Sequence, residues 1–222
     1  VHALFAADRT KISPYSPSSR LFLETLHIDP KALPGFAGSA AARLLEEAAP
    51  RVAALREAQF VDHAGVWEVL CPVLEAAWSD FQARGGDAGF ERFRQAMGQA
   101  LIDHATFEAV AEHFRAQGAQ WLGDWPEPFR DAHSREVRRF RADHPRRVGC
   151  HAWLQWVADA QLADAAQCAR EAGMTLGLYR DLAVGADRAG SEVWSAPHRF
   201  GAGLSVGAPP DPLDHRSCLV WP

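Results

Sequence analysis

Residues 174–211 read MTLGLYRDLAVGADRAGSEVWSAPHRFGAGLSVGAPPD, and this stretch decides the expected fold. Its first six residues, 174–179, form a short apolar run that Gly173 precedes and Arg180 and Asp181 follow. Such a run, bounded in this way, is typical of a buried parallel strand. We therefore predict a strand over 174–179 with Asp181 at its C-terminal end, where parallel α/β sheets and barrels carry their chemistry.

A long helix is expected immediately before this strand. Apolar residues recur at helical spacing over residues 148–172, and Gly173 is the residue type that commonly follows the last helical turn. Helix, glycine stop and buried strand together make an αβ unit. The sequence therefore predicts an α/β fold, either a barrel or a doubly wound sheet.

Between residues 38 and 118 the sequence predicts a succession of helices without a strand. Ser39 has the side chain of an N-cap, Pro50 indicates a break between two helices, and Asp87 caps a later one. We interpret this region as a helical insertion or subdomain. The same apolar stripes would also suit a free-standing helical bundle.

The N-terminal residues predict a strand, a loop and a second extended segment. Residues 1–7 are apolar, residues 9–20 are rich in serine and proline, and residues 22–28 are again extended in pattern. In the loop, Ser13 and Tyr15 offer hydroxyl groups and an aromatic face, which are the groups that bind sugars. The alternative is a polar surface turn.

Composition excludes several classes of function. The chain has 222 residues, a formal charge of −5 and a pI near 6.1, so it lacks the basic field expected of a nucleic-acid-binding protein. No apolar run is long enough for a membrane helix, and no signal peptide is apparent, which favours a cytoplasmic location. The four cysteines lie far apart without metal-ligand spacing. We expect no nucleic acid, membrane, metal or cofactor, and the sequence leaves the oligomeric state open.

Several motifs resemble, in the same order, those of the amylomaltase family of 4-α-glucanotransferases, glycoside hydrolase family 77. The resemblance covers nearly the whole chain, and an ordered series is more specific than any one motif. The motifs that carry it are VHALFAAD, SPYSPSSRLFL, WPEPFRD, WLQWVADAQL, GLYRDLAVG, EVW and SVGAPPD.

This resemblance implies a helix-dominated α/β fold, a partial (β/α)8 TIM barrel with a large α-helical insertion subdomain. It implies that residues 1–30 hold a barrel strand and a substrate loop, and that residues 31–146 form the helical insertion. Residues 147–222 would then hold a barrel αβ unit and active-site loops, truncated at the end, because the agreement with the family stops after Asp214.

The resemblance also implies the candidate site. It places glucan contacts at Ser13, Tyr15, Asp181 and Asp211. Asp181 matches a family aspartate that touches the sugar at the point of cleavage without being the nucleophile. Glu192 is expected in a short helix or turn and is not expected to be catalytic.

No catalytic carboxylate is predicted in this chain. A retaining glycosidase mechanism uses two carboxyl groups about 5 Å apart, which in this family lie in R-I-D-H-type and E-D-L-G-type motifs, with a third aspartate in a T-H-D-type motif. None of these motifs occurs here, and we interpret Ile102-Asp103-His104 as a coincidence within a helical pattern.

Two hypotheses of function remain. The first is a portion of a 4-α-glucanotransferase that transfers segments of α-1,4-glucans such as maltooligosaccharides, starch or glycogen, in which this chain binds substrate and is inactive alone. The second is a non-catalytic maltooligosaccharide-binding or structural helical protein. An unrelated α/β enzyme using Asp181 with a histidine has less support, because no nucleophile elbow or phosphate loop is present.

Overall fold

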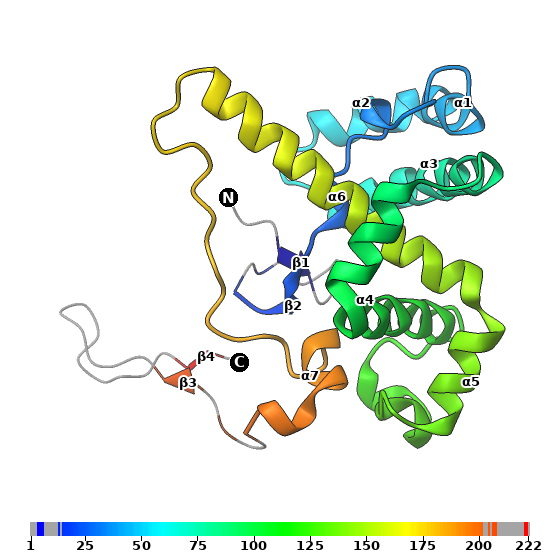
Figure 1. Cartoon of the computed structure of the whole chain (residues 1–222), viewed down its shortest axis with the longest axis vertical. Coiled ribbons are helices and arrows are strands. Elements are labelled where there is room, and N and C mark those ends of the chain that lie inside the picture. The colour runs from blue at the N-terminus through cyan, green and yellow to red at the C-terminus, as the bar shows by residue number, and fades with distance from the viewer. Residues whose placement is uncertain are drawn as a thin grey trace. The chain divides into compact units, whose positions relative to one another are not determined.

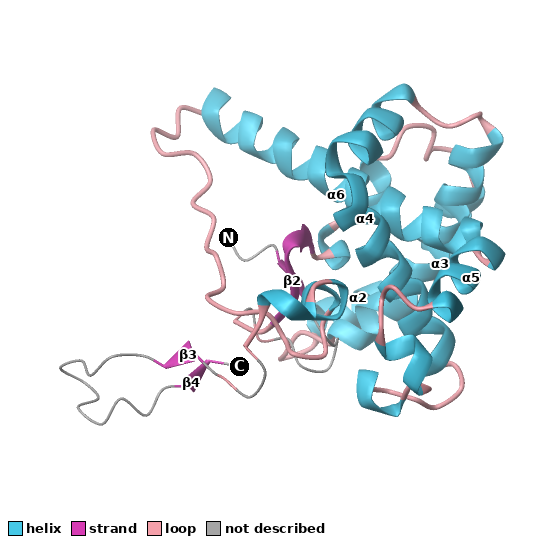
Figure 2. Ribbon diagram, turned by 60° about the horizontal axis from the view of Figure 1, so that its bottom comes forward, coloured by secondary structure: helices cyan, strands magenta, loops and turns pink. Residues whose placement is uncertain are grey.

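The computed structural model describes residues 4–6, 13, 15–201, 204, 206–207 and 220–221. Helices account for most of the described chain, and the strands are short (Figures 1 and 2). The chain divides into two compact units. The first comprises residues 1–24, 99–152 and 178–222, and the second comprises residues 25–98 and 153–177.

The regular elements described in the second unit are all helices. Its full helices are α1 (Ala40–Glu47), α2 (Ala49–Glu57) and α3 (His63–Ala83), preceded by the short 3-10 helices η1 (Thr25–His27) and η2 (Pro30–Ala32). Residues close to the helix ends determine where these helices begin. Ser39 accepts a hydrogen bond from the backbone N–H of Ala42, and Pro50 lies in the first turn of α2. The predicted N-cap and the predicted break are therefore confirmed.

Two longer helices belong to both units. α4 (Ala88–Arg115) bends at Gly98, whose φ of 55° and ψ of −136° are not helical. Only glycine adopts this conformation readily, because a side chain would collide with the backbone. α6 (Pro145–Glu171) ends where Gly173, with φ of 82°, lets the N–H of Met174 reach the carbonyl of Ala169. The predicted helix stop is confirmed, and the bend in α4 was not predicted.

An aromatic cluster forms the core of the second unit. Phe81 of α3 packs against Trp153 and Trp156 of α6, with ring centroids 5.7 Å apart in both pairs. Trp78 and Phe90 extend the cluster at similar distances. Aromatic pairs at this spacing add specific attraction to the burial of their large apolar surface.

The first unit has its own core, built on the second half of α4. Helices η3 (Leu122–Asp124), η4 (Glu127–Arg130), α5 (Arg135–Asp143), α7 (Ser191–Ser195) and η5 (Pro197–Arg199) accompany it. Members of this core, drawn from α4, the segment after it, α5 and α7, include Phe107, Val110, Phe114, Trp125, Val137, Phe140 and Trp194. Trp194 also donates its indole N–H to the carbonyl of Phe129 at 2.9 Å, so its polar atom is satisfied.

The described strands form two antiparallel pairs. β1 (Leu4–Ala6) pairs with β2 (Pro17–Leu23), and β3 (Val206–Gly207) pairs with β4 (Val220–Trp221). The strand predicted in residues 1–7 is confirmed over residues 4–6. The loop predicted for residues 9–20 is wrong at its end, because β2 already begins at Pro17, and η1 replaces the extended segment expected beyond Leu23.

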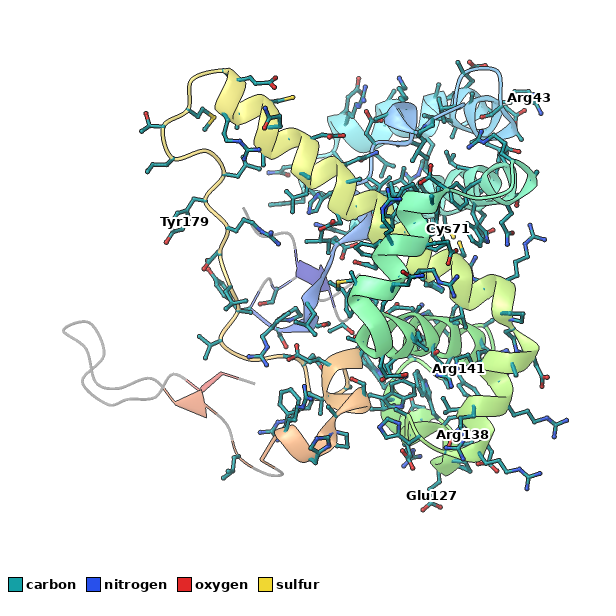
Figure 3. All side chains as sticks on the ribbon, in the orientation of Figure 1. Arg43, Cys71, Glu127, Arg138, Arg141 and Tyr179 are labelled. Atoms are coloured by element: carbon teal, nitrogen blue, oxygen red, sulfur yellow. The ribbon has the colours of Figure 1, made fainter. Side chains whose placement is uncertain are left out.

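The parallel strand predicted for residues 174–179 is wrong. The chain turns at Gly177, whose φ is 64° and whose N–H bonds to the carbonyl of Met174. Within the described residues no strand pairs with this segment, and a strand is stable only where a neighbour completes its backbone hydrogen bonds. Leu176 and Tyr179 are accordingly 90% and 80% exposed. Figure 3 shows the side chain of Tyr179 projecting away from the ribbon.

Neither a membrane span nor a metal cluster is found in the described chain. Its helices are too short or too polar to cross a bilayer. The same residues contain no group of three or more His, Cys, Asp or Glu side chains placed to hold a metal ion.

Candidate functional site

The turn that carries Ser13 and Tyr15 enters β2 beside the segment that follows Asp181. The hydroxyl of Ser16 donates to the carboxylate of Asp187 at 3.2 Å. In return, the backbone N–H of Asp187 donates to the carbonyl of Pro17 at 2.7 Å. Two segments that lie far apart in sequence are thus joined within the first unit.

A buried pair of serines, Ser18 of β2 and Ser191 of α7, forms the next contact of this junction. The N–H of Ser191 donates to the hydroxyl of Ser18 at 2.9 Å, and the two hydroxyl oxygens are 3.3 Å apart. His104 of α4 reaches the Ser191 hydroxyl through Nδ1 at 2.8 Å and stacks on Phe22 at 4.1 Å. Burial lowers the pKa of His104 to about 3, and the charge of His151 adds to this, so the imidazole is neutral at physiological pH.

An ion pair between β2 and α7 forms the third contact of this junction. Arg20 donates from Nε and from its terminal nitrogen to Glu192, the shortest of these bonds being 2.6 Å. The backbone N–H of Arg20 bonds to the same carboxylate at 2.8 Å. Burial raises the pKa of Glu192, but the hydrogen bonds and charge of Arg20 outweigh it, so the pKa lies below its usual value. Glu192 therefore acts as a fixed anion in the scaffold.

Gly190 allows β2 and α7 to approach this closely. A Cβ atom at this position would lie 2.5 Å from the carbonyl oxygen of Ser18 and 2.6 Å from its Cα. Any other residue would therefore push the two backbones apart. The close contact between β2 and α7 therefore requires glycine at position 190.

The predicted site residues fall on the two segments that this junction joins. Ser13 and Tyr15 share one turn, where the N–H of Tyr15 bonds to the Ser13 hydroxyl at 3.4 Å, and Tyr15 is 45% exposed. Asp181 is exposed, and its carboxylate accepts the N–H of Leu182 at 3.0 Å. Asp211 lies outside the described residues. One contact of the junction joins Ser16, the residue after Tyr15, to Asp187, which follows Asp181 by six positions.

Sequence reasoning did not find the residues that make the junction. Ser18 and Arg20 lie within the motif SPYSPSSRLFL but were given no role, Ser191 was not singled out, and His104 was noticed only as part of a coincidental tripeptide. Their partners lie up to 173 residues away. No local pattern reports such a pairing.

A second carboxylate of the first unit is also held as an anion. Glu112 accepts hydrogen bonds from Arg147 and, at 3.2 Å, from His151. Burial raises the pKa of Glu112, but the bonds from His151 and Arg147 prevail and lower it to about 2. The Glu112 carboxylate is thus an ionised member of a network that links α4 to α6.

Solved amylomaltase structures share the architecture of this chain. The amylomaltase of Corynebacterium glutamicum superimposes with a TM-score of 0.70 and 29% sequence identity, over 97% of this chain and 29% of that chain. The amylomaltase of Streptococcus agalactiae in complex with acarbose gives a TM-score of 0.66 at 22% identity, over 91% of this chain and 40% of that chain. The chain is therefore a helix-rich protein with the fold of part of an amylomaltase.

Sequence comparisons identify the family. Residues 1–217 match the 4-alpha-glucanotransferase model of glycoside hydrolase family 77, and the chain belongs to this family. The 4-alpha-glucanotransferases of Haemophilus influenzae and Mycobacterium tuberculosis are 30% and 32% identical over 96% and 90% of the chain. The chain spans only 32% and 27% of the lengths of these relatives. The family expected from the ordered motifs is thus confirmed.

Proposed function

We propose that the protein is a 4-α-glucanotransferase that transfers segments of α-1,4-glucans between sugars with retention. Within it, this chain supplies substrate-binding residues and not the catalytic carboxylates. The family match supports the reaction class. The amylomaltase solved with acarbose supports an oligosaccharide ligand for the fold.

The junction between β2 and the 184–192 segment is the observation that carries this proposal. Ser16, Ser18 and Arg20 each contact a residue of that segment, so the turn with Tyr15 is tethered to the segment after Asp181. A scaffold that ties two polar, exposed segments together is what a binding surface needs. The proposal assigns glucan contacts to Ser13, Tyr15, Asp181 and Asp211.

The side-chain chemistry of these residues suits a sugar. The half-exposed ring of Tyr15 offers an apolar face for a pyranose, and its hydroxyl and that of Ser13 form hydrogen bonds. The exposed carboxylate of Asp181 accepts hydrogen bonds from sugar hydroxyls with the added strength of a charged acceptor. None of these groups needs to react covalently.

The proposal also includes the finer architecture that the resemblance implies. Residues 1–30 and 147–222 would contribute a barrel strand, an αβ unit and active-site loops of a (β/α)8 barrel, and residues 31–146 would be its helical insertion. The nucleophile and the acid/base would come from the part of a whole enzyme that this chain does not represent. A cytoplasmic location belongs to the same proposal, and cell fractionation tests it.

Disproportionation of maltotriose tests the function. The whole gene product is expected to release glucose and form longer maltooligosaccharides, and the 222-residue chain alone is expected to release none. In the whole gene product, Tyr15→Ala removes the aromatic face and its hydroxyl, and Asp181→Asn replaces a charged acceptor, whose hydrogen bonds are worth about 1.5–3 kcal/mol, by a neutral one. We therefore expect kcat/KM to fall at least tenfold. Tyr179→Phe changes the chain's other tyrosine and serves as the control.

The outcomes separate the enzyme from the binding protein. Glucose release by the 222-residue chain above that of its Tyr15→Ala, Asp181→Asn variant would overturn the assignment of a substrate-binding role alone. Tight binding of maltoheptaose by a whole gene product that never disproportionates maltotriose would support the non-catalytic alternative.

A further inference from the structure

The helical second unit has an apolar groove between η2, α1, α2 and the N-terminal part of α3. Its volume is about 780 Å³, and α1 and α2 both contact α3 there (Figure 1). Apolar side chains make up its interior, and several of them are only half-buried, namely Leu45, Val52, Leu55, Val66 and Val69. None of the nine residues of α2 is buried. The described part of the chain therefore leaves this apolar surface uncovered.

The polar residues of the groove are all charged and lie at its edge. Asp29, Lys31, Glu46 and Arg56 line it, and all four are exposed. Among the described residues that line it there is no Ser, Thr, Tyr, Asn, Gln or His side chain. Small-molecule sites combine apolar walls with a few polar groups placed inside. This groove, apolar inside and charged at its edge, has instead the composition of a protein–protein contact.

An exposed apolar pair adjoins the groove. Phe60 and Val61 lie in the connection between α2 and α3, and they are 79% and 70% exposed. Arg56 and Val66, which flank this pair in the sequence, both line the groove. An apolar projection beside an apolar groove makes a continuous patch, and such patches mark interaction surfaces.

Local contacts hold the connection that carries this pair. Asp62 accepts the N–H of Gly65 at 2.8 Å and forms an ion pair with Arg51 at 3.2 Å. Nδ1 of His63 lies 3.2 Å from the carbonyl oxygen of Val61. The exposed pair is thus presented by an ordered turn, so little conformational freedom is lost when a partner covers it.

The charges at the edge of the groove suit a second copy of the same surface. The side chains of Lys31, Glu46 and Arg56 have no hydrogen-bond or ion-pair partner in the part of the chain that the structure describes. Because both signs of charge lie on one surface, a partner of a single strong charge would be repelled by part of it. A second copy related by a two-fold axis can place Arg56 of each copy against Glu46 of the other.

We propose that this groove is a self-association surface that binds a second copy of the protein across a two-fold axis. Phe60 and Val61 of each copy enter the groove of the other, and Arg56 pairs with Glu46 at the edge. The apolar anchor supplies most of the binding energy, and the opposite charges set the orientation. The inference is independent of the proposed function, because it uses no residue of the candidate site.

Sedimentation velocity of the whole gene product tests this surface. The unmodified protein is expected to be a dimer at micromolar concentration. Phe60→Ser with Val61→Ser removes the apolar anchor, and Arg56→Glu sets like charges against each other, so each variant should raise the dissociation constant about tenfold or more. All three positions are exposed, so folding should be preserved, which a thermal melt checks.

A charge exchange distinguishes this pairing from a general effect of charge. Arg56→Glu with Glu46→Arg restores opposite charges across the two-fold axis and should recover the dimer. Arg43→Glu, at an exposed position of α1 that does not line the groove, is the matched control and should leave the dissociation constant unchanged (Figure 3).

Three results would overturn the inference. An unmodified protein that stays monomeric at every concentration would mean that another part of the gene product or a different protein covers the groove. Dimers that survive the Phe60, Val61 variant would place the contact on another surface. A charge exchange that fails to recover the dimer would exclude the two-fold pairing of Arg56 with Glu46.

Discussion

Arg20 on β2 and Glu192 on α7 form a two-pronged ion pair although 172 residues separate them. The side chains are 32% and 15% exposed, so solvent screens the pair only in part. Arg20 also donates to the carbonyl of Val184 at 3.2 Å and lies over the ring of Phe200 at 6.0 Å. One side chain therefore connects β2 with the segment before α7, with α7 itself and with the residue after η5.

Removing this arginine should weaken the first unit measurably. Arg20→Ala leaves the carboxylate of Glu192 without its charged donor, so we expect the free energy of unfolding to fall by about 2–3 kcal/mol in urea denaturation. Arg139→Ala is the control, because its ion pair with Asp143 is 80% and 59% exposed and should contribute at most about 0.5 kcal/mol. Equal losses in the two variants would contradict the role given to Arg20.

The backbone contact at Gly190 gives a second prediction. Gly190→Ala inserts a methyl group against the carbonyl oxygen of Ser18 and should cost about 1–3 kcal/mol of unfolding free energy, because two backbones must separate. Gly123→Ala is the matched control, since a Cβ there meets nothing within 4 Å. A thermal melt of each variant measures the difference, and an unchanged midpoint for Gly190→Ala would show that β2 and α7 are not in this contact.

The helices were predictable because their signals are local. Ser39, Pro50 and Gly173 act on backbone groups within four residues, and each stands where the sequence placed it. The strand at 174–179 was not predictable in the same way, because a strand depends on a partner elsewhere in the chain. Its apolar composition indicated burial, whereas the structure leaves Leu176 almost fully exposed.

The candidate site likewise has residues that were predicted from the sequence and contacts that were not. Ser13, Tyr15 and Asp181 were predicted from motifs that resemble a family, and only the structure shows that Ser16 and Asp187, on the same two segments, are in contact. The roles of Arg20 and Ser191 were not predicted, because their partners lie far away in the sequence. Motifs can therefore suggest candidate binding residues, whereas the contacts that position their segments require coordinates.

The exposure of the 174–184 segment gives a third prediction. In this structure Leu176→Ala should change the free energy of unfolding by less than about 0.5 kcal/mol, because the side chain is 90% exposed. Leu74→Ala, the same substitution at a residue that is 1% exposed in α3, should cost about 2–5 kcal/mol. Urea denaturation of the 222-residue chain compares them directly. A loss of more than 2 kcal/mol for Leu176→Ala would show that this segment packs as a buried strand.

The buried histidine gives a fourth prediction, about pH. The pKa of His104 is about 3 in the folded chain, because burial disfavours the charged ring, and is about 6.5 in an unfolded chain. Between these values the unfolded chain binds one more proton than the folded chain, so stability falls as the pH falls. The expected loss from this residue approaches about 1.4 kcal/mol per pH unit well below pH 6.5 and totals about 1.6 kcal/mol from pH 6.5 to pH 5.

His104→Asn isolates this contribution. The variant keeps a polar atom near the position of Nδ1 for the Ser191 hydroxyl but has no group that titrates in this range. Its absolute stability can be lower because it loses the stacking on Phe22, so the readout is the slope of unfolding free energy against pH. We expect the slope between pH 6.5 and pH 5 to be shallower than that of the unmodified chain by about 1 kcal/mol per unit. Parallel slopes for the His104 variant and the unmodified chain would mean that His104 takes up its proton without leaving the folded state, and the Ser18, Ser191 and His104 contact would then not be the buried, neutral network described here.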